Sequence, residues 1–247
     1  MRRVVRRNLS ARSARILNDE QRDADKLLAA GILDITTEWK RARRNNPLKE
    51  AFGVLRQMAG NRERCMYCGD SHGTDIEHFW PKAPYPARMF RWTNMLLCCN
   101  ECGWIKGDDF PIEHDEPLLI DPASENPWEF LDFDPRTGTI VPRYDQDRQQ
   151  ETPKGQATVR VLELDRREAM ARGYRRSFRH IMRTLEDAIN QPNPDIATLI
   201  QELSDADDHG LLGWIIDGTG RNIRPFVEIR EHYPALWHAC LAAYQQQ

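Results

Sequence analysis

The sequence predicts an α+β protein that is predominantly helical, in which a small cysteine-stapled module is surrounded by helices. Three observations support this fold class. Segments with apolar residues at helical spacing occur near both ends of the chain. Five of the six cysteines fall between residues 65 and 102. The segment around them is rich in glycine, proline and aromatic residues and has little periodicity, which is typical of short strands and turns.

Two helices are expected before the cysteines. The first spans residues 10 to about 30, with Ser10 as N-cap and Gly31 as its end. The second starts at Pro47, which suits a first helical turn, and ends at Gly60. Its apolar residues recur at helical spacing, namely Leu48, Ala51, Phe52, Leu55 and Met58.

After the cysteines, apolar pieces between residues 118 and 142 are separated by proline and glycine turns, so we expect a strand or two there. Residues 143–156 are polar and predict a loop, and Val159 to Leu162 reads as a short strand. A long helix is expected over about 166–189, with further helices at 194–204 and 232–245. The apolar stripe of the long helix comprises Met170, Tyr174, Phe178, Ile181, Leu185 and Ile189.

Arginines are concentrated in two places. One group crowds the start of the chain, where a solvated arm and a phosphate or partner contact are equally good interpretations: Arg2, Arg3, Arg6, Arg7, Arg12 and Arg15. The other falls on the polar face of the long helix, where a solvated surface is the simpler interpretation and binding of nucleic acid or a partner the alternative: Arg172, Arg176, Arg179 and Arg183.

Composition limits the function classes. The net charge of −3 gives no argument for or against nucleic acid from the protein's overall field. No apolar run approaches the roughly 20 residues that cross a bilayer, and no signal-peptide pattern follows the basic start, so we expect a cytoplasmic protein without membrane contact. Disulfides are unlikely in that reducing compartment, and the clustered cysteines therefore indicate metal.

Two Cys-x-x-Cys knuckles predict the metal site. Cys65 and Cys68 form the first, Cys99 and Cys102 form the second, and 30 residues separate them. Each knuckle presents two thiolates on a tight turn, and two such turns complete a tetrahedron around a structural Zn²⁺ with no open position. Redox dithiols or buried free cysteines are the alternative. Cys98 is ambiguous as a neighbour of Cys99, and Cys240 is expected to be an ordinary core cysteine.

Between the knuckles lies a motif suited to phosphodiester hydrolysis. Glu77 and His78 are adjacent, and Asn94 follows within Trp92-Thr93-Asn94. An imidazole can take a proton from water while a neighbouring carboxylate holds a divalent cation. A single histidine is more often structural, so this interpretation depends on the knuckles that flank the motif.

The order of these motifs resembles the HNH (ββα-metal) endonucleases that carry zinc knuckles. More narrowly, it is similar to the HNH nuclease subunit of the Septu anti-phage systems, which also occurs in some retron loci. The resemblance covers residues 62–142 well and the two ends hardly at all. The residues that carry it are Cys65, Cys68, Glu77-His78-Phe79, Pro81-Lys82, Trp92, Asn94, Cys99, Cys102 and Lys106-Gly107-Asp108, continued by Leu119-Ile120-Asp121-Pro122 and Gly138-x-Ile140-x-Pro142.

The resemblance implies roles for individual residues. His78 would be the general base, Glu77 a ligand to a catalytic Mg²⁺ or Mn²⁺ ion, and Asn94 the residue that fixes the loop and orients His78. Lys82 or Lys106 would contact phosphate, with a solvated surface role an equal alternative. It also implies DNA or RNA as substrate and an ABC-type ATPase as partner in a defence complex.

One position departs from the family pattern. Zinc-bearing HNH enzymes usually place Asn or His directly after the last cysteine as another metal ligand, and here that position is Gly103. Water or a nearby side chain would have to replace that ligand, or the module is catalytically weakened. The side chains considered are Asn100, Asp75, Asp108, Asp109 and His114.

These motifs divide the chain into three expected segments: an N-terminal helical arm (1–61), an HNH nuclease module with the zinc site and following strands (62–142), and a C-terminal helical region (143–247). The tryptophans of the central segment, Trp80, Trp92 and Trp104, could stack on bases, although core packing is the favoured interpretation. The main alternative function is a zinc-stapled module that binds nucleic acid or a partner without catalysis. A redox or zinc-sensing protein is the weakest of the three.

Overall fold

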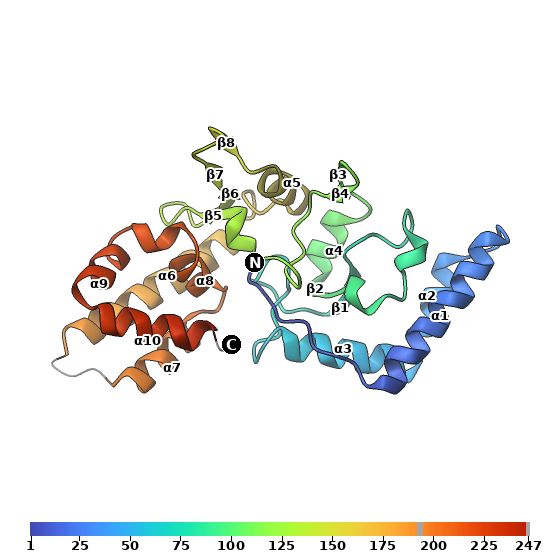
Figure 1. The fold of residues 1–247 in the computed structure, drawn as a ribbon, viewed down its shortest axis with the longest axis horizontal. Coiled ribbons are helices and arrows are strands. Elements are labelled where there is room, and N and C mark those ends of the chain that lie inside the picture. Colours follow the sequence, from blue (N-terminus) through green and yellow to red (C-terminus); the bar gives the residue numbers. More distant parts are fainter. Residues whose placement is uncertain (192–194, 246–247) are drawn as a thin grey trace. The chain divides into compact units, whose positions relative to one another are not determined.

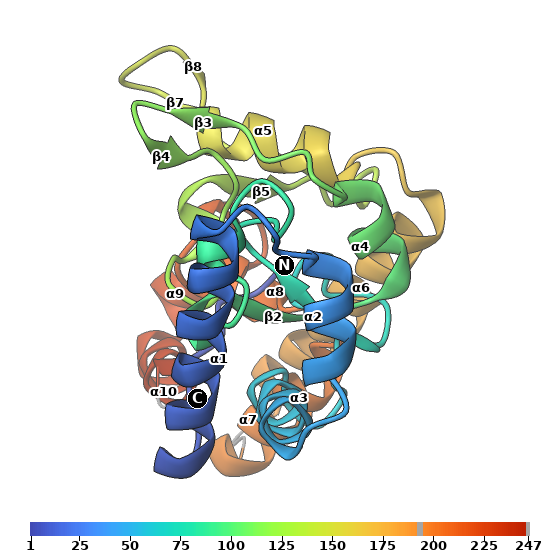
Figure 2. The ribbon, with the colours of Figure 1, turned by 90° about the vertical axis from the view of Figure 1, so that its right-hand side faces the viewer.

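A computed structural model describes residues 1–191 and 195–245. Helices dominate and the strands form small antiparallel pairs, which confirms the mainly helical α+β class. The chain forms two compact units, one of Val4–Ser124 and one of Glu125–Gln247 with Met1–Arg3 (Figures 1 and 2). Among the described residues, no helix has both the length and the apolar character needed to span a bilayer.

The Val4–Ser124 unit contains three helices before the cysteine module and several short elements within and after it. These are α1 (Ala11–Ala29), α2 (Ile35–Ala42), α3 (Asn46–Met58), β1 (Asp75–His78), η1 (Pro86–Arg88), η2 (Trp92–Asn94), β2 (Met95–Cys98), α4 (Asn100–Lys106), β3 (Ile112–Glu113) and β4 (Glu116–Pro117).

The helix ends confirm the sequence signals. Ser10 caps α1 by accepting a hydrogen bond from the backbone N–H of Ser13, and Pro47 lies in the first turn of α3. Gly31 and Gly60 follow the two helices with φ of +71° and +79°, a conformation that favours glycine. Helix α2 was not predicted, because its eight residues offer too short an apolar pattern to recognise.

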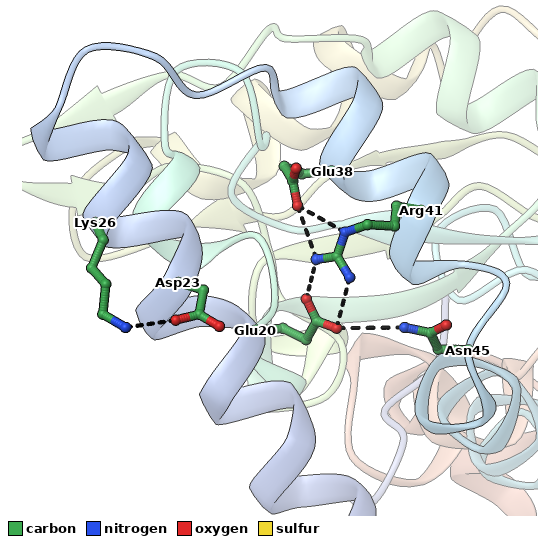
Figure 3. A network of polar contacts seen from close by, with 6 residues as sticks. All are labelled: Glu20, Asp23, Lys26, Glu38, Arg41 and Asn45. Atoms are coloured by element: carbon green, nitrogen blue, oxygen red, sulfur yellow. Dashed lines mark hydrogen bonds and ion pairs between the residues drawn. The ribbon is translucent and has the colours of Figure 1, made fainter.

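A polar network fastens α1 to α2 (Figure 3). The Arg41 guanidinium of α2 pairs with Glu20 of α1 and with Glu38 of its own helix, where its Nη2 lies 2.9 Å from Oε2. Asn45 donates a longer bond of 3.5 Å to Glu20. Exposed ion pairs contribute little singly, but a shared guanidinium fixes the relative position of the two helices. Trp39 of the same helix is buried against His78 and Phe90.

The N-terminal arm is ordered by backbone contacts. The Arg6 guanidinium donates to the carbonyl of Met95 at 2.6 Å and to that of Thr93 at 3.2 Å, and it lies 5.2 Å from the centre of the Trp92 ring. The Trp92 indole N–H in turn donates to the carbonyl of Arg7 at 2.8 Å. Of the two interpretations of the N-terminal arginines, neither a solvated arm nor a phosphate contact fits Arg6. Its guanidinium instead donates hydrogen bonds that hold the loop before β2.

The centre of this unit is the β1–β2 hairpin followed by α4. Asp75 pairs with Cys98 and His78 with Met95 in antiparallel register. All four residues of β2 are buried, whereas β1 alternates between half-buried and buried positions. Figure 1 shows α3 and α4 on opposite sides of this hairpin. The two faces of β1 therefore meet different surroundings.

The second unit is built from hairpins and helices: η3 (Pro127–Glu129), β5 (Leu131–Phe133), β6 (Ile140–Pro142), β7 (Tyr144–Asp145), β8 (Gln150–Glu151), α5 (Pro153–Leu162), α6 (Glu168–Ile189), α7 (Ile196–Ala206), α8 (Leu211–Ile216), η4 (Thr219–Asn222), α9 (Phe226–His232) and α10 (Pro234–Gln245). β5 and β6 confirm the strands expected before residue 142. The expected start of a helix at residue 194 lies outside the described residues, and α7 and α10 confirm the remainder of the two late helices.

The short strand expected from Val159 to Leu162 is wrong, and so is the loop expected over 143–156. The segment 153–162 is the helix α5, with Pro153 in its first turn, and β7 and β8 form a hairpin before it. Burial explains the outcome. The buried positions of α5 follow a helical stripe that begins in the polar-looking part of the segment, and packing overrides the strand preference of the β-branched residues.

The long helix α6 confirms its expected amphipathic pattern. Met170, Tyr174, Ile181 and Leu185 of the apolar stripe are buried. The four arginines of the opposite face are exposed, and Arg172 pairs with Glu168 at 3.3 Å. Met1 is also fully buried in this unit, where its backbone nitrogen lies 2.6 Å from the Tyr174 hydroxyl.

Gly155 of α5 provides a test of the packing in this unit. A Cβ at this position would meet the carbonyl oxygen of Phe130 at 2.2 Å. Helix propensity alone would make Gly155→Ala stabilising, whereas the overlap predicts a loss of about 1–3 kcal/mol in the free energy of unfolding. Urea unfolding of the two proteins measures the difference, and an increase in stability would contradict this packing of α5.

Candidate functional site

The two cysteine knuckles come together as expected. The Sγ atoms of Cys65, Cys68, Cys99 and Cys102 lie within 4.8 Å of one another, and all four residues are buried. The first knuckle precedes β1. The second begins at the N-cap of α4, where the Cys99 sulfur accepts a hydrogen bond from the Cys102 N–H at 3.4 Å. The hairpin and the helix are therefore joined through sulfur atoms.

The chemistry of this cluster fits zinc. A tetrahedral ion with Zn–S bonds of about 2.3 Å sets neighbouring sulfurs roughly 3.8 Å apart, and the Cys68 and Cys99 sulfurs are 3.9 Å apart. Burial raises the pKa of the Cys65 thiol well above its usual value. A bound cation would favour the thiolate forms that burial alone disfavours.

Cys98 lies beside the cluster but differs from its four members. Its Sγ is 3.9 Å from that of Cys65, and its thiol donates to the carbonyl of Cys99 at 3.2 Å. Four sulfurs already complete a tetrahedron. Cys98 therefore fits the role of a buried neighbour, which answers a question that its position in the sequence left open.

Glu77 meets a buried lysine from α4. The Lys106 side chain is fully buried, and its Nζ donates to Glu77 Oε1 at 2.9 Å and to the carbonyl of His78 at 3.0 Å. The Glu77 side chain remains 21% exposed. Gly103 faces its other oxygen, because a Cβ there would lie 3.6 Å from Oε2. Lys106 thus holds the carboxylate rather than presenting its charge at the surface.

The ring of His78 is buried, contrary to the solvent access expected of a general base. The residue is 2% exposed, and the Trp39 ring meets it edge-on at 4.4 Å between centroids. Its Nε2 lies 2.8 Å from the carbonyl oxygen of Met89. Because a carbonyl only accepts, Nε2 carries the proton and Nδ1 keeps the basic lone pair.

Electrostatics keep the His78 ring neutral. Burial lowers the pKa of His78 to about 3, and the nearby charges of Lys82 and Lys106 act in the same direction. Within the described chain, no protein group hydrogen-bonds to Nδ1, and Nδ1 is not among the fully buried polar atoms that lack a partner. The ring is therefore an unprotonated base at neutral pH.

Asn94 organises the segments on both sides of the hairpin. Its Oδ1 accepts from the backbone N–H of Trp80 at 2.7 Å, and its Nδ2 donates to the carbonyls of Trp80 and Arg88 at 3.0 Å. The carbonyl that holds His78 belongs to Met89, the next residue after Arg88. A single buried amide therefore fixes the exit of β1 and the loop that contacts the imidazole.

Gln21 supports the same loop from α1. Its buried amide donates to the carbonyl of Pro86 at 3.1 Å and accepts from the N–H of Phe90 at 2.7 Å. Neither this contact nor the one between Trp39 and His78 was predicted from the sequence. Both come from helices outside the motif, and only burial of a polar side chain within an amphipathic helix could have suggested Gln21.

The described residues hold no second cluster of ligands beside Gly103. The cysteine cluster is the only group of three or more Cys, His, Asp or Glu residues in the described chain that could share an ion. Asp75 pairs with Arg43 at 2.7 Å, and Asn100 accepts from Thr74 at 3.0 Å. Glu77 offers one carboxylate ligand, which is compatible with Mg²⁺ because that ion keeps several waters and takes substrate phosphates as ligands.

The tryptophans of the module differ from one another. Trp80 packs against Phe110 at 4.7 Å, with the guanidinium of Arg88 at 4.2 Å from its ring, and Trp92 lies under Arg6. These two have structural contacts, as the favoured interpretation expected. Trp104 is 86% exposed on α4, one residue from Gly103, so core packing is wrong for Trp104.

Comparison with known proteins gives one distant match. The chain is 29% identical over 120 residues to the Septu protein PtuB of Bacillus thuringiensis, a match that covers 45% of this chain and 40% of that protein. The aligned part thus spans less than half of either protein. No family model matches the chain.

Metal analysis tests the cysteine cluster. We expect one zinc per chain by elemental analysis, and Cys68→Ser or Cys102→Ser should lose the ion and much of the stability of the module, because the four buried sulfurs act as a unit. Cys98→Ser and Cys240→Ser are the matched controls and should keep the metal. Loss of zinc in the Cys98 variant would contradict the assignment of the four ligands.

The buried imidazole predicts a pH dependence of stability. The pKa of His78 is lowered from 6.5 to about 3 by folding, so the unfolded state binds the proton first as pH falls. The contribution of His78 to the free energy of unfolding is complete above pH 6.5. As the pH falls toward 3, this contribution is lost at up to about 1.4 kcal/mol per pH unit. Urea unfolding of the wild type and of His78→Gln between pH 7 and pH 5 measures it. Parallel stability curves would show that the ring is not buried in its neutral form.

Proposed function

We propose that this protein is a metal-dependent HNH endonuclease that hydrolyses phosphodiester bonds of DNA or RNA. The observation that carries the proposal is the arrangement around His78. A carbonyl fixes its tautomer, Glu77 is its neighbour on β1, and the cysteine cluster joins this hairpin to α4. The order of two antiparallel strands and a helix, with these residues on the first strand, is the arrangement that the resemblance to ββα-metal nucleases implies.

In this proposal His78 accepts a proton from water at Nδ1, while Nε2 stays bonded to the Met89 carbonyl. Glu77 would hold a Mg²⁺ or Mn²⁺ ion, which supplies charge stabilisation for the phosphate when bound. Asn94 keeps the loop and the ring in position. Because Trp39 covers the ring, hydrolysis requires that water and the scissile phosphate reach Nδ1 past this side chain.

The likeness to Septu protein PtuB supports a place in anti-phage defence. We infer a cytoplasmic complex with an ABC-type ATPase subunit, in which nuclease activity depends on the partner. Further candidates for contact with nucleic acid are the exposed Trp104, the half-buried Lys82 and the exposed arginines of α6.

A second candidate function is a zinc-stapled binding module without catalysis. Gly103 favours it, because the position offers no ligand, and so does Lys106, which neutralises the Glu77 carboxylate that would hold a catalytic ion. The adjacent pair of Glu77 and His78 favours the nuclease, since a binding module has no need of a desolvated neutral base.

A nicking assay separates the two functions. The protein, alone and with its ATPase partner, should cut plasmid DNA or RNA with added Mg²⁺ or Mn²⁺. His78→Ala should reduce the rate by at least about 100-fold, because the general base is lost, while the bound zinc is retained. The control His238→Ala alters an exposed histidine of α10 and should cut normally.

Cutting that survives His78→Ala at full rate would remove His78 from the mechanism. Substrate that shifts in mobility yet stays intact with every metal and partner would support the binding module instead.

A further inference from the structure

A polar groove of about 610 Å³ lies in the Val4–Ser124 unit, beside α3. None of the residues discussed around the cysteine cluster lines it. One wall is α3, the end is the turn that follows this helix, and the N-terminal arm contributes an arginine. The lining residues are Arg7, Gly53, Arg56, Gln57, Gly60, Asn61 and Glu63.

The wall contributed by α3 is a single helical face. Gly53, Arg56 and Gln57 follow the spacing i, i+3 and i+4 on α3, and Gly60 lies in the turn after the helix. The opposite face is the buried stripe that includes Leu48, Ala51, Leu55 and Met58. The helix therefore packs with one side and presents the other to the groove.

Gly53 has no evident role in the fold. It lies in the interior of α3, where glycine costs helix stability relative to alanine. A Cβ at this position would meet nothing within 4 Å, and its φ is not in the left-handed region. Because glycine has no Cβ, it also lets another molecule approach the helix backbone closely at this position.

Arg7 is held at the groove with its charge free. Its backbone carbonyl is fixed by the Trp92 indole at 2.8 Å. The side chain is exposed, and within the described chain its guanidinium forms no hydrogen bond or ion pair. Ordering a backbone position while leaving the cation unpaired suits recognition of an external anion.

The remaining lining groups are mostly donors. The Arg56 Nε donates a hydrogen bond of 2.7 Å to Glu63, which is the only carboxylate among the lining residues. The terminal amino groups of the Arg56 guanidinium are not used in this bond. Gln57 and Asn61 add exposed side-chain amides. Guanidinium and amide donors along an open groove are the groups that contact phosphate oxygens of nucleic acid.

We propose that this groove binds the phosphodiester backbone of nucleic acid, with Gly53 at the closest approach and Arg7 as the main cation. The identity of the polyanion rests on the proposed function, because nucleic acid is the substrate of that activity. The site is distinct from Glu77 and His78 and acts in binding alone.

Binding to a short fluorescent DNA duplex tests the groove, in the full chain with zinc retained and no Mg²⁺ or Mn²⁺ added, so that no cutting is required. Arg7→Gln should weaken binding about tenfold and lower the slope of log affinity against log salt by about 0.9. Arg22→Gln is the matched control, because Arg22 is an exposed arginine on α1 paired with Asp19. It should leave affinity nearly unchanged.

Gly53→Ala gives the sharper result, because the added methyl group should stabilise the helix but obstruct the ligand. It should raise the melting temperature by about 2–4 °C while weakening the duplex affinity by a factor similar to that of Arg7→Gln. A variant that is less stable would show that the glycine serves the fold, and one that is more stable with full affinity would show that nothing approaches it. Either result would overturn the proposal.

The remaining outcomes are also decisive. Equal effects of Arg7→Gln and Arg22→Gln on duplex affinity would overturn the groove as a nucleic-acid site. So would a wild-type protein that does not bind the duplex, which is the result expected if the occupant is an acidic protein. Cutting in the nicking assay that is unaffected by Arg7→Gln would sink the groove and leave the nuclease proposal intact. If cutting does not depend on His78 but duplex binding is weakened by Arg7→Gln, the nuclease proposal falls and the groove remains a nucleic-acid site.

Discussion

The rest of the candidate site depends on four buried sulfur atoms that lie within 4.8 Å of one another. β1, β2 and α4 are four, four and seven residues long, too short to be stable on their own. Four thiolates this close together in a dry interior would repel one another unless a cation compensates, so the cluster and its ion would act as one structural unit. Glu77, His78 and Asn94 are held in place because the elements that carry them are joined at this point.

His78 and Glu77 are adjacent in sequence but have opposite environments. Alternation along β1 places the carboxylate toward Lys106 of α4 and the imidazole beneath Trp39 of α2. Burial keeps the base neutral, which a proton acceptor requires, but it also restricts the access of water. The same packing therefore keeps the ring neutral and limits what can reach it, and the network around Arg41 joins the helix that carries Trp39 to α1.

The sequence predicted those parts of the fold that local patterns determine. The two knuckles, the ends of α1 and α3 and the amphipathic pattern of α6 were visible because caps and periodicity are local. The short strand at Val159 was wrong, since burial against distant residues decided that segment. The cover on His78 and the position of Lys106 could not be predicted, because both depend on side chains far apart in the sequence. The roles of His78, Glu77 and Asn94 remain proposals.

The division of the chain into compact units has a consequence for the order of folding. Met1–Arg3 belong to the same unit as Glu125–Gln247, and the contact of Met1 with Tyr174 joins residues 173 positions apart. Such a contact closes a long loop, and contacts between distant parts of a chain form slowly. The Val4–Ser124 unit lies within that loop and has its own internal contacts, so helices α1 to α4 can pack without waiting for this closure.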